Sequence, residues 1–257
     1  MRNILAIWQR EMRSYFVSPI AYVVLAIFLL LAGLVFYSLL ASVVQQTLLQ
    51  AQYGQGMQPV DVPRIVTQSL FQTTSVILLF VVPMLTMGLF AEEKKRGTIE
   101  LLLTTPVGNL QALLGKYVAS LTFLLIMFAG IAVIISPLFL YGRPDWKPIF
   151  SGFLGMFLYG AAVLAMGLFI STLTENQIVA VIITFGVSLV FWLIDAVLVA
   201  SSTGVTRSVI SYLSVVGHLE DFLKGVIDTS HIIYYVTFAF VGLFLAYRSL
   251  ESMRWKG

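Results

Sequence analysis

The side chains that could carry out chemistry are few, and most of them lie at the ends of long apolar stretches. The 257-residue chain contains no cysteine, so it has no thiolate nucleophile and no cysteine-based metal site. His218 and His231 have three acids nearby, Glu220, Asp221 and Asp228, but their spacing matches no compact set of metal ligands. No other cluster of His, Asp and Glu in the sequence is suited to catalysis. The sequence therefore predicts neither a metal site nor a catalytic site in this chain.

One acid, Asp195, follows directly on the apolar residues 191–194. Charged groups inside a membrane are costly and usually functional, which would make Asp195 a binding site for a substrate or a proton. The alternative is an acid at the outer membrane interface, hydrated or paired with a base such as Arg207. We favour the interfacial position, and a single marginal acid gives little support to an ion-driven carrier.

The sequence contains no nucleotide-binding loop. A Walker A loop has the pattern G-x-x-x-x-G-K-[ST], and its backbone amides cradle the phosphates. The nearest approach, at Gly115 and Lys116, has Leu110 in place of the first glycine and Tyr117 in place of Ser or Thr. Energy for active transport must therefore come from another chain or from an ion gradient.

A charged segment at 92–106 is the most informative part of the chain. Its sequence, EEKKRGTIELLLTTP, opens with five charges, followed by Gly97, which permits a sharp turn, and Thr98, which can cap a short helix. The residues that give this helix an apolar side and then end it are Ile99, Leu102, Leu103 and Pro106. Such a helix either docks against a partner protein or lies at the lipid surface with its charges in water.

Composition indicates that lipid, not water, surrounds most of the chain. It is 59% hydrophobic and 11% charged, with a mean hydropathy of +0.96, whereas soluble domains carry about 25% charged residues. Six stretches lack Asp, Glu, Lys and Arg, at 17–60, 65–91, 117–142, 149–174, 176–194 and 232–247. Because a helix needs about 20 residues to cross a bilayer, we predict an all-α polytopic membrane protein with six transmembrane helices and one domain over 1–257. The first span should cover 20–43, since the glutamine-rich residues after it predict a polar loop.

The distribution of Lys and Arg predicts the orientation of these spans. With the N-terminus inside, ten of the 15 basic residues lie on the inner side and five on the outer side. The inner ten are Arg2, Arg10, Arg13, Lys94, Lys95, Arg96, Lys116, Arg248, Arg254 and Lys256, and the outer five are Arg64, Arg143, Lys147, Arg207 and Lys224. We therefore expect a multi-pass protein with both termini in the cytoplasm. The same placement accounts for the net charge of +3 without nucleic-acid binding.

Residues 1–18 form a separate amphipathic segment before the first span. Apolar residues recur at helical spacing on one face, and Trp8, Arg10 and Arg13 are suited to anchor such a helix at the cytoplasmic surface of the bilayer. The alternative is a straight extension of the first span. We prefer the interfacial helix because the Ser-Pro pair that follows residue 17 favours a break in the chain.

Two further patterns concern short helices and packing. Residues 201–230, on the outer side, have apolar residues at helical period interrupted by glycines, which predicts one or two short amphipathic helices. The fourth span has small residues four apart, Ser151 with Gly155 and Ala161 with Ala165. This spacing lets helix backbones approach closely, so we expect the fourth span to be tightly packed, within one subunit or between two.

The segment 92–106 resembles the coupling helix of permeases of the ABC-2-type transporter superfamily, through the pattern E-E-K-x-x-G-T-x-E-x-L-L-x-x-P. Four further segments are similar to the gliding-motility-associated (Gld-type) branch of these permeases. They are REMRSYFVSPIAY at 10–22, LTENQIVA at 173–180, HLEDFLKGVID at 218–228 and RSLE at 248–251. These segments follow the expected order over nearly the whole chain.

The resemblance implies a permease subunit of an ATP-binding-cassette exporter in the inner (cytoplasmic) membrane, with no cofactor of its own. It implies two cytoplasmic ABC ATPase subunits, which bind ATP and Mg and dock on a coupling segment at 92–110. It also implies a second permease copy or a related permease, and it allows for a periplasmic or extracellular accessory protein. By the same resemblance, the residues that transmit force are Glu92, Glu93, Lys94, Gly97, Thr98, Glu100, Leu102, Leu103 and Pro106.

Three other functions are alternatives to an exporter permease. An ion-coupled secondary carrier or channel would transport without an ATPase, but the chain lacks internal repeats and clustered intramembrane acids. A membrane enzyme would need a catalytic constellation, and none occurs in the sequence. A mechanical membrane anchor would use the same ATPase motion to drive an extracellular partner without moving a substrate.

Overall fold

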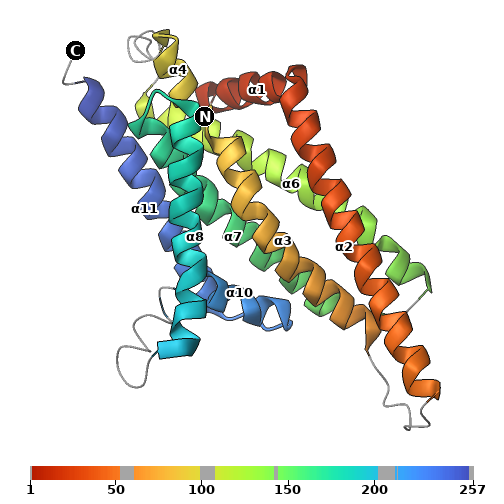
Figure 1. The fold of residues 1–257 in the computed structure, drawn as a ribbon. Helices are drawn as coiled ribbons and strands as arrows, with labels where there is room; N and C mark the ends of the chain where they lie inside the picture. Colours follow the sequence, from red (N-terminus) through yellow and green to blue (C-terminus); the bar gives the residue numbers. More distant parts are fainter. Residues whose placement is uncertain are drawn as a thin grey trace.

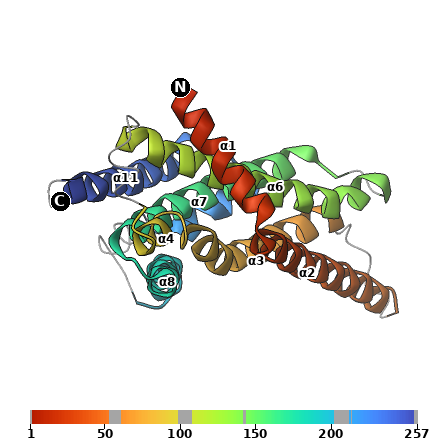
Figure 2. The ribbon, with the colours of Figure 1, turned by 90° about the horizontal axis from the view of Figure 1, so that it is seen from above.

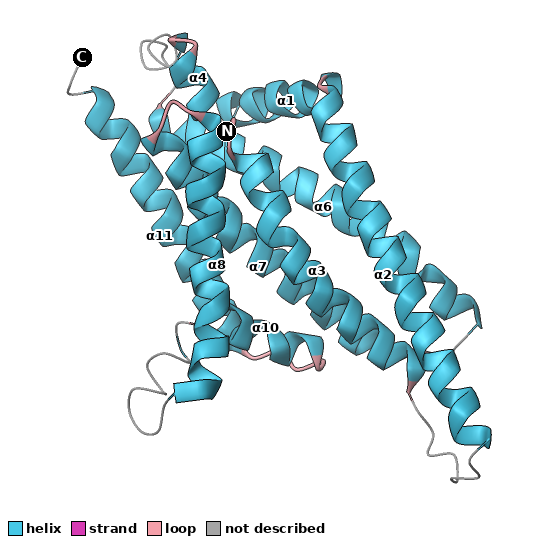
Figure 3. Ribbon diagram, viewed as in Figure 1, coloured by secondary structure: helices cyan, strands magenta, loops and turns pink. Residues whose placement is uncertain are grey.

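The computed structural model of the chain describes residues 2–52, 61–98, 108–141, 144–201, 212 and 214–254. Within these ranges every regular element is a helix, as Figure 1 and Figure 3 show. The helices are α1 (Arg2–Val17), α2 (Pro19–Gln52), α3 (Val62–Thr86), α4 (Ala91–Lys95), α6 (Asn109–Tyr141), α7 (Trp146–Leu173), α8 (Gln177–Ser201), α10 (Val215–Leu223) and α11 (Thr229–Arg254).

Six helical segments in the described ranges are long and apolar enough to cross a membrane. They are Pro19–Leu49, Val62–Lys95, Asn109–Leu140, Trp146–Leu173, Gln177–Ile194 and Thr229–Met253. The prediction of an all-α membrane protein with six spans is therefore confirmed. The second of these segments runs from α3 through a tight turn into α4, so the charges of α4 mark its end.

Helix α2 is longer than the sequence pattern predicts. We expected a polar loop after residue 43, but the helix continues to Gln52. Residues 44–52 contain no Gly or Pro, and Gln, Leu and Ala are good helix formers. At about 1.5 Å per residue, the 34 residues of α2 extend about 51 Å, well beyond the roughly 30 Å of hydrocarbon. Part of α2 therefore projects from the lipid core, and in Figure 1 its orange end extends past α3.

Helix α7 is the centre of the bundle. Helices α3, α6, α8, α10 and α11 all pack against it, and 67% of its span is buried, against 22% for α2 and 17% for α8. Its glycines allow this close packing. A Cβ at Gly152 would come within 2.5 Å of the Phe71 ring, and one at Gly155 would come within 2.5 Å of Phe222. The small residues of the predicted pairs are all buried, so the tight packing expected of the fourth span occurs within one subunit.

The two ends of the bundle carry different short helices. Helices α1 and α4 and the C-terminal end of α11 lie at one end, and α10 lies at the other (Figure 1). Helix α1 ends at Val17, a bend follows at Ser18, and α2 begins at Pro19, because the residue before a proline is disfavoured in helical conformation. Helix α1 consequently crosses over α6 instead of extending α2, as the view in Figure 2 shows.

Candidate functional site

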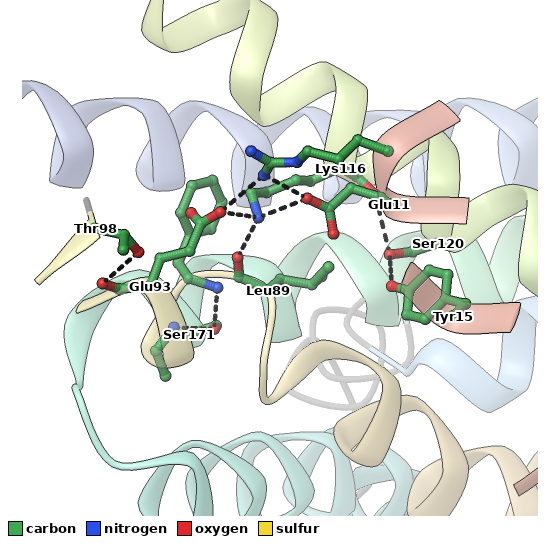
Figure 4. A network of polar contacts seen from close by, with 11 residues as sticks. Glu11, Tyr15, Leu89, Glu93, Thr98, Lys116, Ser120 and Ser171 are labelled. Carbon is green, nitrogen blue, oxygen red and sulfur yellow. Dashed lines mark hydrogen bonds and ion pairs between the residues drawn. The ribbon is translucent and has the colours of Figure 1, made fainter. Parts of the chain in front are cut away.

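One serine of α7 fixes the turn between α3 and α4. Ser171 Oγ accepts hydrogen bonds from the backbone amides of Phe90 and Ala91, both at 3.1 Å, and donates to the carbonyl of Met87 at 3.2 Å. Ser171, Phe90 and Ala91 are fully buried. Because amides at the start of a helix have no partner within it, the hydroxyl satisfies groups that would otherwise be orphaned. The base of α4 is thereby attached to α7 (Figure 4).

Helix α4 is five residues long, and a glycine in the left-handed conformation follows two residues after its end. Gly97 has a φ of +68°, a conformation that glycine adopts without steric cost. Thr98 Oγ1 donates to the carbonyl of Glu93 at 3.2 Å, and Arg96 forms an ion pair with Glu92 one turn away. These contacts close α4 and turn the chain away from its axis.

Several predicted site residues fall outside what the structure describes. The second half of the predicted coupling segment, 99–107, is outside the described residues, and so is the short helix expected there. This half includes Glu100, Leu102, Leu103 and Pro106. Asp195 lies in α8, but its side chain is not among those described.

The ammonium group of Lys116, on α6, is the centre of a buried ionic network (Figure 4). Its side chain is 2% exposed. The Nζ atom donates to the Leu89 carbonyl at 2.7 Å, to Glu93 at 2.9 Å and to Glu11 at 3.2 Å. It also lies 5.1 Å from the centre of the Phe90 ring. The three N–H donors of the ammonium therefore have three oxygen acceptors, which offsets the cost of burying its charge.

Arg10, on α1, completes the network from its exposed side. Its guanidinium donates to Glu11 Oε1 at 2.8 Å and to Glu93 Oε1 at 3.0 Å. Each of these two carboxylate oxygens also accepts from Lys116, so two acids and two bases form a closed set across α1, α4 and α6. The second oxygen of Glu93, Oε2, is buried and has no hydrogen-bond partner among the described residues.

The network shifts the pKa values of its α1 members. Burial raises the pKa of Glu11, but the cations Lys116 and Arg10 and the hydrogen bonds that they donate outweigh it, so the net pKa is lowered. The hydrogen bond to Glu11 raises the pKa of Arg10, against the opposing effect of burial. Burial raises the pKa of Tyr15 to about 12, and its hydroxyl lies 3.2 Å from Ser120 Oγ on α6. At neutral pH the acid and the base are therefore charged, and the phenol is neutral.

Helix α1 is held on α6 by close packing as well as by charge. A Cβ at Gly115 would come within 2.7 Å of the Ile7 side chain, so the glycine makes room for α1. Trp8, which we expected to anchor α1 among lipid headgroups, donates through Nε1 to Thr122 Oγ1 of α6 at 3.0 Å. Gly115 and Lys116, which partly match the nucleotide-binding loop pattern in the sequence, therefore lie where α6 contacts α1.

These polar contacts thus join α1, α4, α6 and α7 at one end of a six-span membrane protein. Residues 5–236 match the family described as ABC-2 family transporter protein. The chain belongs to the ABC-2 family of transporters. No match is found among curated proteins.

As an ABC-2 permease, this chain is the membrane subunit of a transporter. Permeases of this family have no catalytic site, and they work with separate ABC ATPase subunits. The predicted permease role, and the prediction that ATP is hydrolysed by another chain, are therefore confirmed at the level of the family.

The predicted site residues of this ABC-2 permease are only partly brought together. Glu93 of the coupling segment meets Arg10 of α1, whereas Trp8 contacts α6 elsewhere. Arg13 is exposed, and Lys94 is half-buried on α4.

Sequence reasoning did not assign a role to Lys116 or Glu11. Lys116 was counted as a marker of membrane orientation, and Glu11 appeared only within the segment 10–22. Their positions in the sequence were the signal that could have indicated a role for these two residues. In a chain with 11% charged residues, an acid on an amphipathic helix and a base at the mouth of a span are both expected to need partners.

Proposed function

We propose that this chain is the permease of a Gld-type ABC exporter in the cytoplasmic membrane. Motion of the ATPase subunits enters it at residues 92–106 and passes through Glu93 to α1 and α6. The observation that carries this proposal is the sharing of Glu93 Oε1, which accepts from Lys116 of α6 at 2.9 Å and from Arg10 of α1 at 3.0 Å. One carboxylate of α4 thus binds two other helices.

The buried charges make this connection stiff. Removing one partner of a buried ion pair leaves an uncompensated charge, at a cost of about 3–5 kcal/mol. Helix α4 is therefore expected to move together with α1 and α6, while Ser171 attaches its base to α7. A push on α4 is consequently distributed over three helices.

Helix α4 has two faces that suit two different roles. Glu93 points into the ionic network (Figure 4), whereas Lys95 and Arg96 are exposed. In our proposal the exposed bases, together with the apolar residues of 99–106, form the surface on which the ATPase docks. Glu93 then acts on the permease side of the same short helix.

The proposed orientation places α4 and both chain termini in the cytoplasm. The excess of ten basic residues over five on that side supports it. The arrangement of the helices is compatible with it, because α1, α4 and the end of α11 lie at the same end of the bundle (Figure 1). Helix α10 then lies on the outer side.

In this proposal the complete transporter contains two ATPase subunits that bind ATP and Mg, and a second permease copy or a related permease. An accessory protein outside the membrane is compatible with it. The Gld-type branch is supported by the segments at 10–22, 173–180, 218–228 and 248–251. The first of these contains Arg10 and Glu11, so the segment that carries the resemblance also supplies two members of the ionic network.

The transmission route is tested with Glu93→Gln in the complex of permease and ATPase. The chain has no cysteine, so spin labels can be attached at Arg13→Cys on α1 and Val190→Cys on α8, two exposed positions. We expect trapping of the ATPase with ATP and vanadate to change the distance between the labels in the native protein. In Glu93→Gln the ATPase should stay bound, but this change should be lost.

The matched control is Glu251→Gln on α11. Glu251 also forms an ion pair at the same end of the bundle, with Arg248, but it lies outside the network. Its variant should respond to ATP like the native protein. A Glu93→Gln complex that keeps the distance change, or that loses the ATPase altogether, contradicts transmission through Glu93.

The orientation is tested by labelling single cysteines in intact cells. Lys95→Cys should react with a membrane-impermeant maleimide only after the cells are opened. Lys224→Cys, beyond the end of α10 and 47% exposed, should react in intact cells. The reverse pattern would place α4 outside the cell, where no ATPase could reach it.

A further inference from the structure

At the end of the bundle opposite the ionic network, two histidines meet across the junction of α10 and α11. His218 Nδ1 lies 2.6 Å from His231 Nδ1. His231 Nε2 lies 2.9 Å from a carboxylate oxygen of Asp221, and His218 Nε2 lies 3.1 Å from the carbonyl oxygen of Tyr212. Both rings are largely buried, with His218 8% exposed. Among the described residues no group of three or more His, Cys, Asp or Glu side chains is arranged to hold a metal ion.

Counting hydrogens shows that neutral histidines cannot make all three contacts. A carbonyl oxygen and an ionised carboxylate only accept hydrogen bonds, so the Nε2 atoms of His218 and His231 must both carry hydrogen. The contact between the two Nδ1 atoms needs one more. The two rings therefore require three hydrogens, whereas two neutral imidazoles carry two. The geometry is complete only when the group holds one additional proton.

Without that proton one of the contacts must be lost. Two bare Nδ1 lone pairs at 2.6 Å would repel, and turning either ring away would break its contact with Asp221 or Tyr212. With the proton, the positive charge shared by the rings is balanced by Asp221. A short distance between the two Nδ1 atoms is what a charge-assisted hydrogen bond produces.

We propose that His218, His231 and Asp221 form a binding site for a single proton, and that the bound proton fastens α10 to α11. The neighbouring contacts support this role. Tyr235 of α11 donates to the Val215 carbonyl at the start of α10, at 2.6 Å. When the proton leaves, the contact between the two histidine rings breaks, whereas the bond from Tyr235 to Val215 stays.

Other titratable groups lie near the histidine pair. Tyr234 stacks on His218 at 4.0 Å between ring centres, and the Tyr212 ring lies edge-on to His218. Lys224 Nζ lies 3.7 Å from Asp221 Oδ1, and Asp228 is near enough to His231 for an electrostatic interaction. Among the described residues, α3, α7 and α8, which also pack on α10, contribute no ion pair to the site. Among the residue types that meet here, histidine is the one that ordinarily changes charge near neutral pH.

The sign of the pH effect follows from the proton count. If the closed junction binds one more proton than the open one, closing becomes up to tenfold less favourable for each unit that the pH rises. Alkaline conditions should release α10, and mildly acidic conditions should hold it. In the orientation proposed above, the site would respond to the pH outside the cell. The site itself does not depend on that orientation or on the ATPase.

The first test counts the protons directly. These are the chain's only histidines, so the full-length protein labelled with ¹⁵N-histidine and reconstituted in lipid nanodiscs gives signals from this site alone. Between about pH 5.5 and 7.5 we expect three of the four ring nitrogens to carry hydrogen, with the two rings titrating as one coupled unit. Two rings that titrate independently, each taking up its own proton, would overturn the proposal.

The second test measures what the proton does to α10. Hydrogen exchange of the 215–223 amides, corrected for intrinsic exchange, should show opening that rises with pH in the native protein by up to about tenfold per unit. In Asp221→Asn, α10 should open more than in the native protein at pH 6, and its opening should no longer rise with pH. Glu220→Gln is the matched control, because Glu220 is similarly exposed and its ion pair among the described residues is with Lys224, not with a histidine. Equal pH profiles for native protein and Asp221→Asn would contradict a proton that fastens α10.

Discussion

The two ends of the bundle hold their short helices by different kinds of charge. At the α1–α4–α6 end, Arg10, Glu11, Glu93 and Lys116 are residue types that are ordinarily charged at neutral pH, and their ion pairs form without an added proton. At the α10–α11 end, the contacts are complete only when a proton is added. One end is therefore closed at any physiological pH, whereas the other is closed conditionally.

This difference indicates a division of labour within the permease. A connection that must transmit force benefits from charges that are always present, since a contact that comes and goes would make coupling unreliable. A connection that can open and close is suited to adjustment by the surroundings. The four predictions that follow separate these two behaviours, from the largest expected effect to the smallest.

The largest effect is expected from Lys116→Met, which removes the centre of the fixed-charge end. Among the described residues, Arg10 would be the remaining base that pairs with Glu11 and Glu93. We expect a loss of about 3–5 kcal/mol in stability, measured by thermal unfolding in detergent. Lys147→Met is the control, because Lys147 is exposed and should change stability by less than about 0.5 kcal/mol. Equal effects of the two substitutions would show that the network is not structural.

Ser171→Ala should break the attachment of the same end to α7. The buried amides of Phe90 and Ala91 would lose their acceptor, at about 1–3 kcal/mol for each amide left unsatisfied. Ser136, on α6, bonds only within its own helix, so Ser136→Ala is the matched control. Thermal unfolding and hydrogen exchange near 87–92 measure the difference. Unchanged protection of these amides would refute the role of the hydroxyl.

Both ends also depend on a glycine, which allows a direct comparison of their packing. A Cβ at Gly155 would collide with Phe222 of α10, and one at Gly115 would collide with Ile7 of α1. Each Gly→Ala variant should lose about 1–3 kcal/mol. A Cβ at Gly186, on α8, meets nothing within 4 Å, so Gly186→Ala should be neutral or add about 0.5–1 kcal/mol. A Gly155→Ala variant as stable as the native protein would show that α10 packs loosely against α7.

The smallest effect sharpens the comparison through pH. The pKa of Glu11 is lowered in the folded protein, so its stabilisation is present above its usual value of 4.5 and is lost as the pH falls through the lower folded value. Glu11→Gln should therefore cost about 1 kcal/mol at neutral pH and progressively less in acid. Thermal unfolding from pH 7 downward checks this slope. A difference that grows in acid would have the wrong sign.

Much of the fold could be predicted from the sequence because lipid imposes strong constraints. The absence of charge over some 20 residues is an unambiguous signal of a span, and all six were found this way. The predicted end of α2 was wrong, because glutamine is compatible with both loop and helix, and no glycine or proline occurs in residues 44–52 to end the helix.

The polar sites were harder to predict, because they are made by partners distant in sequence. Lys116 lies 105 residues from Glu11, and nothing local shows that a base at the mouth of a span turns inward. His218 and His231 are 13 residues apart, and their spacing was judged only against metal-ligand patterns. Such partners follow from the need of each buried polar group for a hydrogen bond once the helices pack.

The closed ionic network has a consequence for how the permease meets its ATPase. Two acids and two bases cancel within a few ångströms, so the network adds little field beyond the Debye length of about 10 Å at 0.1 M salt. Long-range attraction toward this end would then come from exposed bases outside the network, such as Lys95 of α4 and Arg13 of α1. The rate of association should fall steeply as ionic strength rises, while the stiffness of the assembled complex should not.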